Sequence, residues 1–406
     1  MNVIVAQSGG PTSVINSSLA GVISASINNN FDKVYLSLHG IEGIINKEIA
    51  QVDKEKYKEN NIESQLISRP SSILGSCRYK LPDSSDDEIF DKIFETLKEY
   101  KISTFIYIGG NDSMDTVMKL NEYMEDHNIR DINIIGCPKT IDNDLMEMDH
   151  SPGFASTAKY ITTTLRTLRT DVDIYDLESV TFVEIMGRDA GWLAASSLTA
   201  NYQMDKEVVN LLYLPEDKKS LDQILEEIKS ELRYESNLIV AVAEGFRDKD
   251  NKLDEVSFSN KDDSFGHKVV AGVGHRLADL IRNKLEIKSR AVELNIAQRT
   301  SNLISKVDAK EAYNLGYKAL ELGVDNTNLI PVLKRKDSSD YQVYYESVSP
   351  DKIANKEMKI PKEWLVDKKT LEAKMTSYTL PLIEGMVEQN YQNGMPVFVR
   401  LDDFIK

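Results

Sequence analysis

Residues Pro138 to Asp144 bring an ammonium group, a hydroxyl and two carboxylates close together in the chain. They read Pro-Lys-Thr-Ile-Asp-Asn-Asp and follow an apolar stretch, Ile132 to Ile135, that predicts a strand. Asp142 and Asp144 are two residues apart, so in an extended segment both carboxylates would point to one side. A carboxylate can take a hydroxyl proton and a cation can neutralise phosphate charge, as phosphoryl transfer requires. A polar turn between a strand and a helix is the alternative interpretation.

Two other stretches repeat the pattern of a short apolar strand, a glycine turn and a helix. The first comprises a strand at Val3 to Ala6, the pair Gly9-Gly10 and a helix at Val14 to Ile27, and the second a strand at Thr104 to Ile108, the pair Gly109-Gly110 and a helix at Thr116 to Met124. This alternation predicts a parallel sheet with helices on both faces, whose ligands bind at the carboxyl ends of the strands. Such turns suit a phosphate, although a plain tight turn would use the same glycines.

The bulk composition argues against several classes of function. The chain has 406 residues, enough for two or three domains, and its formal net charge of −16 argues against a nucleic-acid partner. No apolar run approaches the roughly 18 residues that a membrane helix needs, and the N-terminus lacks the basic start of a signal peptide. Cys77 and Cys137 form neither a disulfide framework nor a metal-ligand pattern. We expect a cytoplasmic protein without a membrane or nucleic-acid partner, in which a locally positive cleft can still bind a small anion.

Five motifs, in this order, resemble those of the phosphofructokinase family. They are Gln7-Ser8-Gly9-Gly10-Pro11, Gly75-Ser76-Cys77-Arg78, Gly109-Gly110-Asn111-Asp112-Ser113, Pro138-Lys139-Thr140-Ile141-Asp142-Asn143-Asp144 and Met186-Gly187-Arg188-Asp189-Ala190-Gly191-Trp192. The resemblance extends from residue 3 to about residue 300. Within the family the chain resembles the pyrophosphate-dependent branch, whose members reversibly phosphorylate fructose 6-phosphate at its 1-hydroxyl with Mg²⁺.

The resemblance implies a fold and an assembly. It implies two Rossmann-like three-layer α/β/α domains with mostly parallel sheets, and an active site in the cleft between them. The pyrophosphate- and Mg²⁺-binding domain would comprise residues 1–153 and about 298–345, and the sugar-phosphate-binding domain residues 154–297 and about 346–406. Family members assemble as dimers or tetramers, so a homodimer or homotetramer is expected. In the C-terminal part we expect a helix at Ala309 to Leu322 and an exposed polar loop at Lys334 to Asp340.

Two positions distinguish the phosphoryl donors within the family. ATP-dependent members have glycine at the positions of Asp112 and Lys139. The Asp112 carboxylate would crowd and repel the α-phosphate of ATP, whereas the Lys139 ammonium suits a compact diphosphate. Pyrophosphate is therefore the expected donor, with an ATP-dependent 6-phosphofructokinase as the alternative.

The resemblance also implies roles for individual residues. Asp142 would accept the proton of the sugar hydroxyl, with Lys139 and Thr140 as the other catalytic residues. The implied pyrophosphate-binding residues are Gly10, Arg78, Gly110, Asp112, Ser113 and Lys139. The implied sugar-phosphate-binding residues are Thr140, Asp142, Met186, Gly187, Arg188, Glu244, Arg290 and Arg299. Mg²⁺ would be held by Asp112 and Asp144.

The chain departs from the family pattern around the acceptor. Ile296 stands where a histidine or tyrosine is usual, and Glu178-Ser179 stands where an arginine commonly reaches a neighbouring subunit's sugar phosphate. An acid near a bound phosphate is unfavourable. Fructose 6-phosphate is the expected acceptor. Another sugar phosphate, such as sedoheptulose 7-phosphate, and a non-catalytic regulatory homologue are the alternatives.

Overall fold

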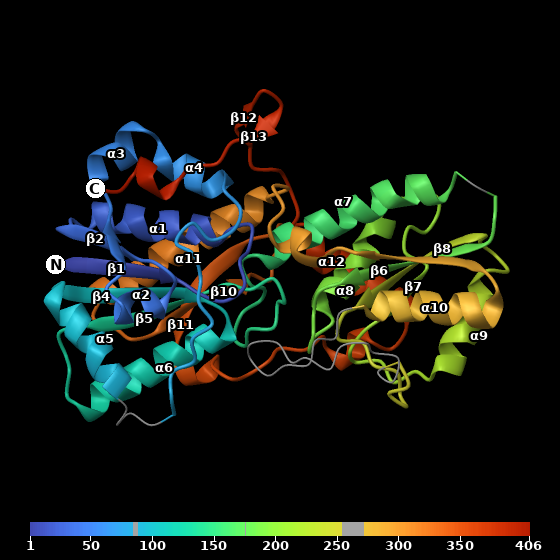
Figure 1. The fold of residues 1–406 in the computed structure, drawn as a ribbon, viewed down its shortest axis with the longest axis horizontal. Helices are drawn as coiled ribbons and strands as arrows, with labels where there is room; N and C mark the ends of the chain where they lie inside the picture. The colour runs from blue at the N-terminus through green and yellow to red at the C-terminus, as the bar shows by residue number, and fades with distance from the viewer. Residues whose placement is uncertain (84–87, 175, 254–271) are drawn as a thin grey trace. The chain divides into compact units, whose positions relative to one another are not determined.

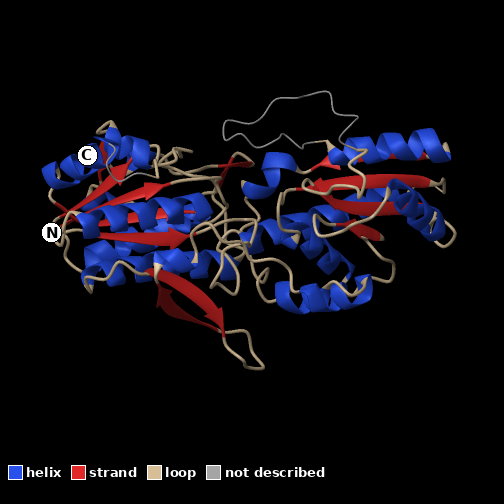
Figure 2. Ribbon diagram, turned by 90° about the horizontal axis from the view of Figure 1, so that it is seen from below, coloured by secondary structure: helices blue, strands red, loops and turns tan. Residues whose placement is uncertain are grey.

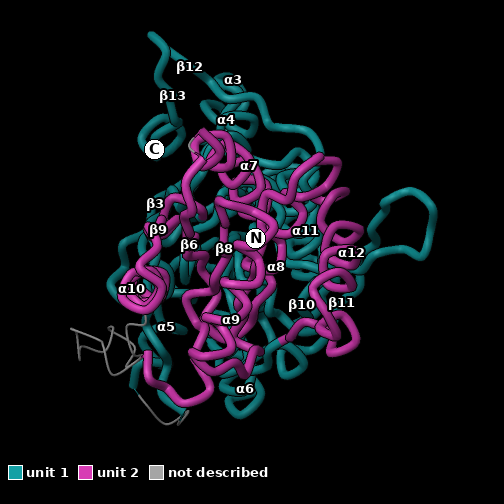
Figure 3. The backbone as a smooth tube through the Cα atoms, turned by 90° about the vertical axis from the view of Figure 1, so that its right-hand side faces the viewer, with its two compact units in different colours: residues 1–156, 299–357, 383–406 teal, residues 157–298, 358–382 magenta. Residues whose placement is uncertain are grey.

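The structure is a computed structural model that describes residues 1–83, 88–174, 176–253 and 272–406 (Figure 1). The chain forms two compact units, which Figure 3 shows in different colours. Unit 1 contains Met1–Ser156, Arg299–Glu357 and Ile383–Lys406, and unit 2 contains Thr157–Gln298 and Met358–Leu382. The division expected from the sequence assigns all of residues 346–406 to the second domain, whereas only Met358–Leu382 of that tail groups with unit 2.

Unit 1 is built on a five-stranded sheet in the order β3-β2-β1-β4-β5. The strands are β1 (Asn2–Gln7), β2 (Lys33–Ser37), β3 (Ile49–Gln51), β4 (Ile102–Gly109) and β5 (Asn133–Pro138). Neighbouring strands run parallel except for the edge pair β2 and β3. Gln7 pairs with Ile108, and Gly109 pairs with Pro138. The carboxyl ends of β1, β4 and β5 therefore lie at the same edge of the sheet.

Helices cover both faces of this sheet (Figure 2). One face packs against α1 (Ile15–Asn28), α4 (Ile62–Ser68) and α11 (Lys306–Val324), and the other against α2 (Ile41–Ile45), α5 (Glu88–Glu99) and α6 (Asn111–Asp126). The short helix α3 (Lys54–Glu59) contacts α4. In β1, Val3 and Val5 belong to the first core while Ile4 and Ala6 belong to the second, as strand alternation requires. The result is a three-layer unit.

Two glycines allow α1 and α11 to pack closely. A Cβ atom on Gly21 of α1 would lie 2.0 Å from the carbonyl oxygen of Tyr313. A Cβ atom on Gly316 of α11 would lie 2.1 Å from the carbonyl oxygen of Ser18. Both obstacles are backbone atoms, which cannot rotate aside as the end of a side chain can. Any larger residue at either position would push the two helices apart.

The rest of unit 1 consists of two antiparallel hairpins and short helical turns. The hairpin strands are β10 (Ile330–Arg335) with β11 (Val343–Val348), and β12 (Tyr391–Gln392) with β13 (Met395–Pro396). The 3₁₀ turns are η4 (Pro350–Lys352) and η6 (Leu401–Asp403). The expectation of a loop beginning at Lys334 is wrong, because Lys334 and Arg335 complete β10 and pair with β11.

Unit 2 contains a four-stranded parallel sheet in the order β7-β8-β6-β9. The strands are β6 (Ser179–Ile185), β7 (Leu211–Tyr213), β8 (Asn237–Ala243) and β9 (Lys288–Glu293). The helices are α7 (Phe154–Val172), which begins in unit 1, α8 (Trp192–Ser196), α9 (Leu221–Glu231), α10 (Val273–Leu285) and α12 (Lys368–Thr379), with the 3₁₀ turns η1 (Ser197–Asn201), η3 (Asn295–Arg299) and η5 (Lys362–Trp364). Helices α9 and α10 pack on one face of the sheet. None of the described helices has the length and apolar composition needed to cross a membrane.

The substitution Gly316→Ala is expected to destabilise the protein, because the new methyl group must move α11 away from α1. Overpacking of this kind costs about 1–3 kcal/mol, which urea unfolding can measure. Lys310→Ala, at an exposed position of the same helix, is the matched control and should stay within about 0.5 kcal/mol of the parent. Equal stability of the two variants would show that the helix contact tolerates a larger residue.

Candidate active site

Three segments that the sequence singles out meet at the carboxyl edge of the unit 1 sheet. The Ser8-Gly9-Gly10 turn follows β1, α6 follows β4, and Lys139 follows β5. Backbone hydrogen bonds join them, from the Ser8 N–H to the Ile108 carbonyl oxygen at 2.9 Å and from the Lys139 N–H to the Gly109 carbonyl oxygen at 2.9 Å. The strand register thus brings together Gly10 and Lys139, which are 129 positions apart in the chain.

The Gly75–Arg78 segment lies beside the same turn. The Gly9 N–H donates to the Cys77 carbonyl oxygen at 3.3 Å, and the Ser76 hydroxyl donates to the Gly9 carbonyl oxygen at 2.6 Å. Gly9 has a φ of 73°, which favours glycine at this point. Arg78, the next residue of the segment, is exposed. A planar guanidinium next to a glycine turn can bind phosphate oxygens.

Lys139 is buried at the centre of this edge, with 2% of its surface exposed. Its ammonium group donates to the Gly10 carbonyl oxygen at 2.7 Å. A Cβ atom on Gly9 would lie 3.3 Å from the Lys139 Nζ, and one on Gly10 would lie 3.5 Å from a terminal guanidinium nitrogen of Arg299. Two cationic groups therefore flank the glycine turn. The family resemblance implies a sugar-phosphate role for Arg299, and the structure places it beside the turn expected to bind pyrophosphate.

The charge state of Lys139 depends on its surroundings. The pKa of Lys139 is lowered from 10.5 to about 8, chiefly by burial and also by the positive charge of Arg299. The carboxylates of Asp142 and Asp144 act in the opposite direction and raise it. The ammonium, the guanidinium and both carboxylates thus form one electrostatic cluster.

The loop after Lys139 is not the extended segment that the sequence suggested. Asn143 has a φ of 59°, in the left-handed region that asparagine tolerates better than most residues, so the strand argument for Asp142 and Asp144 does not apply. The Asn143 side chain is buried and its amide oxygen accepts a hydrogen bond from the Ser151 N–H at 2.8 Å. The Asp142 N–H donates to the Thr140 hydroxyl at 3.2 Å. Hydrogen bonds within the loop, and not strand alternation, therefore shape the backbone that carries the two carboxylates.

A second anchor closes the loop against the glycine turn. The Thr140 N–H donates to the Pro152 carbonyl oxygen at 3.1 Å. Gly153 has a φ of 112°, and a Cβ atom there would lie 2.7 Å from the Cγ2 of Thr12. Only glycine fits at this point, where the loop touches the segment after Gly10.

The Gly109–Ser113 motif differs locally from the sequence prediction. Helix α6 begins at Asn111, so Asp112 and Ser113 lie in its first turn and not in a preceding turn. Asp112 is exposed, and its negative charge is favourable at a helix N-terminus. Ser113 is buried beside Gly109, whose Cβ would lie 2.0 Å from the Ser113 Oγ. Gly110 caps the helix with extended backbone.

Asn111 has a structural role that the sequence did not reveal. Its side-chain amide donates to the Lys356 carbonyl oxygen at 2.6 Å and accepts from the Asn355 N–H at 2.6 Å. Residues about 245 positions apart are joined by these two bonds, so local spacing could not have indicated them. The motif fastens the C-terminal tail to the start of α6.

A second group of predicted site residues lies at the carboxyl ends of β6 and β8 in unit 2. Met186, Gly187 and Arg188 follow β6, and Glu244 follows β8. The Arg188 Nε lies 3.5 Å from a carboxylate oxygen of Glu244. A Cβ atom on Gly245 would lie 1.8 Å from the Arg188 carbonyl oxygen, so a glycine is needed where the two turns cross. The guanidinium is exposed, and can bind an anion while the carboxylate accepts hydroxyl hydrogen bonds.

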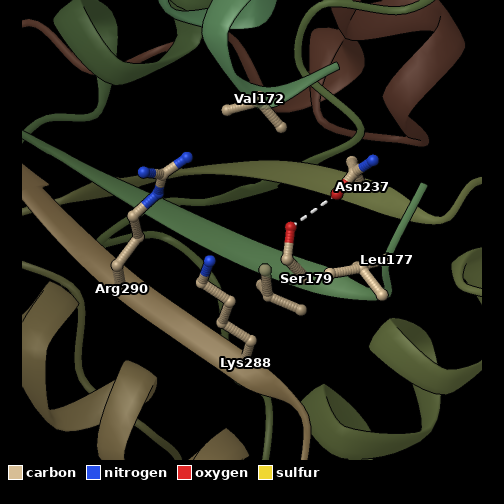
Figure 4. Close-up of a pocket in the computed structure, with 7 residues that line it drawn as sticks. Val172, Leu177, Ser179, Asn237, Lys288 and Arg290 are labelled. Atoms are coloured by element: carbon tan, nitrogen blue, oxygen red, sulfur yellow. Dashed lines mark hydrogen bonds between the residues drawn. The ribbon is translucent and has the colours of Figure 1, made fainter. Parts of the chain in front are cut away.

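Arg290 does not lie with Arg188 and Glu244. It is on β9, paired with Thr181, and its Nε donates to the Thr181 hydroxyl at 3.1 Å. Thr181 lies four residues before the end of β6, a distance of roughly 13 Å along the strand. Figure 4 shows Arg290 beside Lys288 at a small pocket lined also by Ser179, whose hydroxyl donates to the Asn237 amide oxygen at 2.6 Å. Glu178, next to this pocket's Ser179, and Ile296 are both exposed.

Comparison with known proteins settles the family. The family model described as phosphofructokinase matches residues 2–323. This chain belongs to the phosphofructokinase family. The predictions of this family and of its α/β fold with mostly parallel sheets are confirmed.

Individual relatives add detail. A pyrophosphate–fructose 6-phosphate 1-phosphotransferase from Halomonas elongata is 33% identical over 98% of this chain and 96% of its own length. A sulfofructose kinase from Alkalicoccus urumqiensis is 32% identical over 84% of this chain and 86% of its own. The crystal structure of a pyrophosphate-dependent phosphofructokinase from Nitrosospira multiformis superposes with a TM-score of 0.86, at 30% sequence identity, over 100% of this chain and 97% of that one.

Lys139 is expected to titrate near pH 8, well below an ordinary lysine, because burial disfavours its charged form. NMR of the protein with isotope-labelled lysine side chains can measure this, and Lys139→Met assigns the signal. Asp142→Asn should lower the pKa of Lys139 further, since it removes a negative charge that raises it. A Lys139 signal that titrates with the exposed lysines would contradict the burial of this ammonium.

Proposed function

We propose that this protein transfers a phosphoryl group reversibly from pyrophosphate to the 1-hydroxyl of fructose 6-phosphate, giving fructose 1,6-bisphosphate and phosphate. The observation that carries the proposal is the Lys139 ammonium, buried against the Gly10 carbonyl oxygen. It fills space that a glycine at this position would leave to a nucleotide, and it supplies the charge that a compact diphosphate needs. The relatives named for pyrophosphate and fructose 6-phosphate support the same reaction.

Unit 1 would bind the donor and perform the proton transfer. Asp142 would accept the proton of the 1-hydroxyl as its oxygen attacks phosphorus and the bond to the bridging oxygen of pyrophosphate breaks. Lys139 would neutralise charge on the departing phosphate, and Thr140 would orient the reacting groups. The proposed donor-binding residues are Gly10, Arg78, Gly110, Asp112, Ser113 and Lys139. Arg299, beside Gly10, is near enough to this group to contact a bound phosphate.

Unit 2 would bind the acceptor. Arg188 would pair with the sugar phosphate, Glu244 would accept hydrogen bonds from sugar hydroxyls, and the backbone of Met186 and Gly187 would shape the turn. Arg290, separated from Arg188 along the sheet, would serve a sugar phosphate bound to a neighbouring copy of the chain. The proposal also includes a homodimer or homotetramer and a cytoplasmic location.

The residues present fit a bound Mg²⁺. The proposed donor set would consist of the carboxylates of Asp144 and Asp112, and among the described residues no group of three His, Cys, Asp or Glu side chains is arranged as a metal site. Mg²⁺ commonly uses only one or two carboxylates and completes its shell with substrate phosphate oxygens and water. When bound, it would neutralise charge on the pyrophosphate oxygens.

A second candidate function is phosphorylation of an acceptor other than fructose 6-phosphate. One relative is named a sulfofructose kinase, and this chain has the exposed acid Glu178 where an arginine is common. The decisive assay measures initial rates with fructose 6-phosphate and Mg²⁺, with pyrophosphate and ATP side by side. The assay is then repeated with sedoheptulose 7-phosphate and a sulfonated fructose. Turnover only with ATP would overturn the proposed donor, and absence of turnover with every pair would favour a regulatory homologue.

Removal of the proposed base is expected to abolish most activity. Asp142→Ala should lower kcat by roughly two to four orders of magnitude, because the group proposed to take the hydroxyl proton is removed. The control Asp131→Ala, at an exposed carboxylate, should keep the parent rate. If Asp142→Ala retained a rate close to that of this control, Asp142 would not be the base.

Donor preference should change when both distinguishing side chains are removed. The double variant Asp112→Gly, Lys139→Gly is expected to raise kcat/KM for ATP and to lower it for pyrophosphate, because space opens and a cation is lost. Both single variants and the thermal midpoint of each protein are the controls. An unchanged ratio of the two kcat/KM values in a folded double variant would show that other residues select the donor.

A further inference from the structure

His150 is fully buried at the end of the loop that carries Asp142 and Asp144. Its Nδ1 lies 2.8 Å from a carboxylate oxygen of Asp149, and its Nε2 lies 2.7 Å from a carboxylate oxygen of Glu311. An ionised carboxylate can only accept a hydrogen bond, so both ring nitrogens must donate. The geometry therefore favours an imidazolium held between two negative charges.

Each carboxylate has a second partner from another element. The Arg335 guanidinium, on β10, lies 3.1 Å from Asp149. The Tyr341 hydroxyl, from the connection between β10 and β11, donates to Glu311 at 2.6 Å, and the Arg335 guanidinium stacks over the Tyr341 ring at 5.0 Å. Two cations thus balance two anions, and every group has a hydrogen-bond partner. We name His150, Asp149, Glu311, Arg335 and Tyr341 the histidine clamp.

The clamp is connected to the candidate catalytic segment by a short path. Ser151, the next residue, donates its N–H to the side chain of Asn143, which lies between Asp142 and Asp144. Gly153 donates its N–H at 2.9 Å to Asp308, which is one turn before Glu311 on α11. Pro152 accepts from the N–H of Thr140. A displacement of His150 would therefore be transmitted to both ends of Thr140–Asp144.

We propose that His150, held as an imidazolium between Asp149 and Glu311, is a positioning residue that keeps Thr140–Asp144 in its reactive geometry, so that the phosphoryl-transfer rate falls when His150 loses its proton. The inference rests on the proposed function. The physical cause is charge balance: without the proton, Asp149 keeps Arg335, but among the described residues Glu311 keeps only the neutral Tyr341 as a hydrogen-bond partner. A buried carboxylate left without a cation is strongly unfavourable, and the loop must rearrange to relieve it.

The clamp sets the pH range of the effect. Burial alone would lower the pKa of His150, but Glu311 and Asp149 outweigh burial and raise the pKa to about 9. The positive charge of His150 in turn acts to lower the pKa of the nearby carboxyl group of Asp308, which burial raises. Because the folded pKa is above the ordinary value of 6.5, the stabilising contribution is complete below pH 6.5 and is lost as the pH rises through about 9. A bound pyrophosphate would keep Lys139 protonated, so the titration of Lys139 near 8 in the free enzyme should appear in kcat/KM for pyrophosphate, whereas the clamp should appear in kcat.

The test combines pH profiles with NMR of the histidine side chains. In the parent, kcat should fall above about pH 9, with the same midpoint as the imidazole signal of His150. Glu311→Gln should move both midpoints down by roughly one pH unit or more, because one negative partner is gone. His150→Gln should remove this fall in kcat and lower kcat about tenfold or more at all pH values, with little change in KM. The control His127→Gln alters an exposed histidine and should change none of these results.

Two results would overturn the inference. One is a His150 signal that titrates near pH 9 while kcat does not change with it. The other is a folded His150→Gln protein with the parent's kcat and pH profile. If the parent protein showed no turnover with any pair of donor and acceptor, the proposed function would be wrong. The clamp could still be tested by measuring the pKa of Lys139. Loss of the segment's geometry in His150→Gln should lower the pKa of Lys139, since Asp142 and Asp144 raise it, and an unchanged value would reject the clamp.

Discussion

A lysine ammonium buried at the carboxyl edge of a parallel sheet is the constraint on which the candidate active site depends. Charge removed from water must be compensated nearby, and Lys139 has one carbonyl oxygen and two neighbouring carboxylates to do so. Arg299 adds a second cation at the same turn. A small anion of high charge density bound there would offset the charges of both cations. The electrostatics therefore favour pyrophosphate over a bulkier ligand.

The sheet can hold this cluster because three strands end together. Parallel register fixes the ends of β1, β4 and β5 with backbone hydrogen bonds, and the glycines at those ends let the following segments approach one another. Unit 2 uses the same device where Gly245 passes the Arg188 carbonyl oxygen. In both units, the packing of the main chain positions the segments that carry the charged side chains of the site.

Sequence patterns predicted the parts of the fold that depend on local regularity. Short apolar runs indicated β1 and β4 to within two residues and indicated β5, which ends three residues beyond the predicted strand, and the ordered motifs indicated the family, which is confirmed. The missed features depend on distant contacts. His150 and Glu311 are 161 positions apart, and nothing in the spacing of either residue indicates the other. The left-handed conformation of Asn143 was missed because the prediction assumed that the extended backbone of β5 continues through Asp144.

Helix α11 connects the packing of unit 1 to its chemistry. Its middle contacts α1 through Gly21 and Gly316, and its first two turns present Asp308 and Glu311 to the loop that carries Asp142. Helix α1 follows the glycine turn that accepts the Lys139 hydrogen bond. The spacing of one helix pair therefore determines where the glycine turn and the loop lie relative to each other. Because interiors are close-packed, a change at this helix contact would reach Asp142 without any substitution near it.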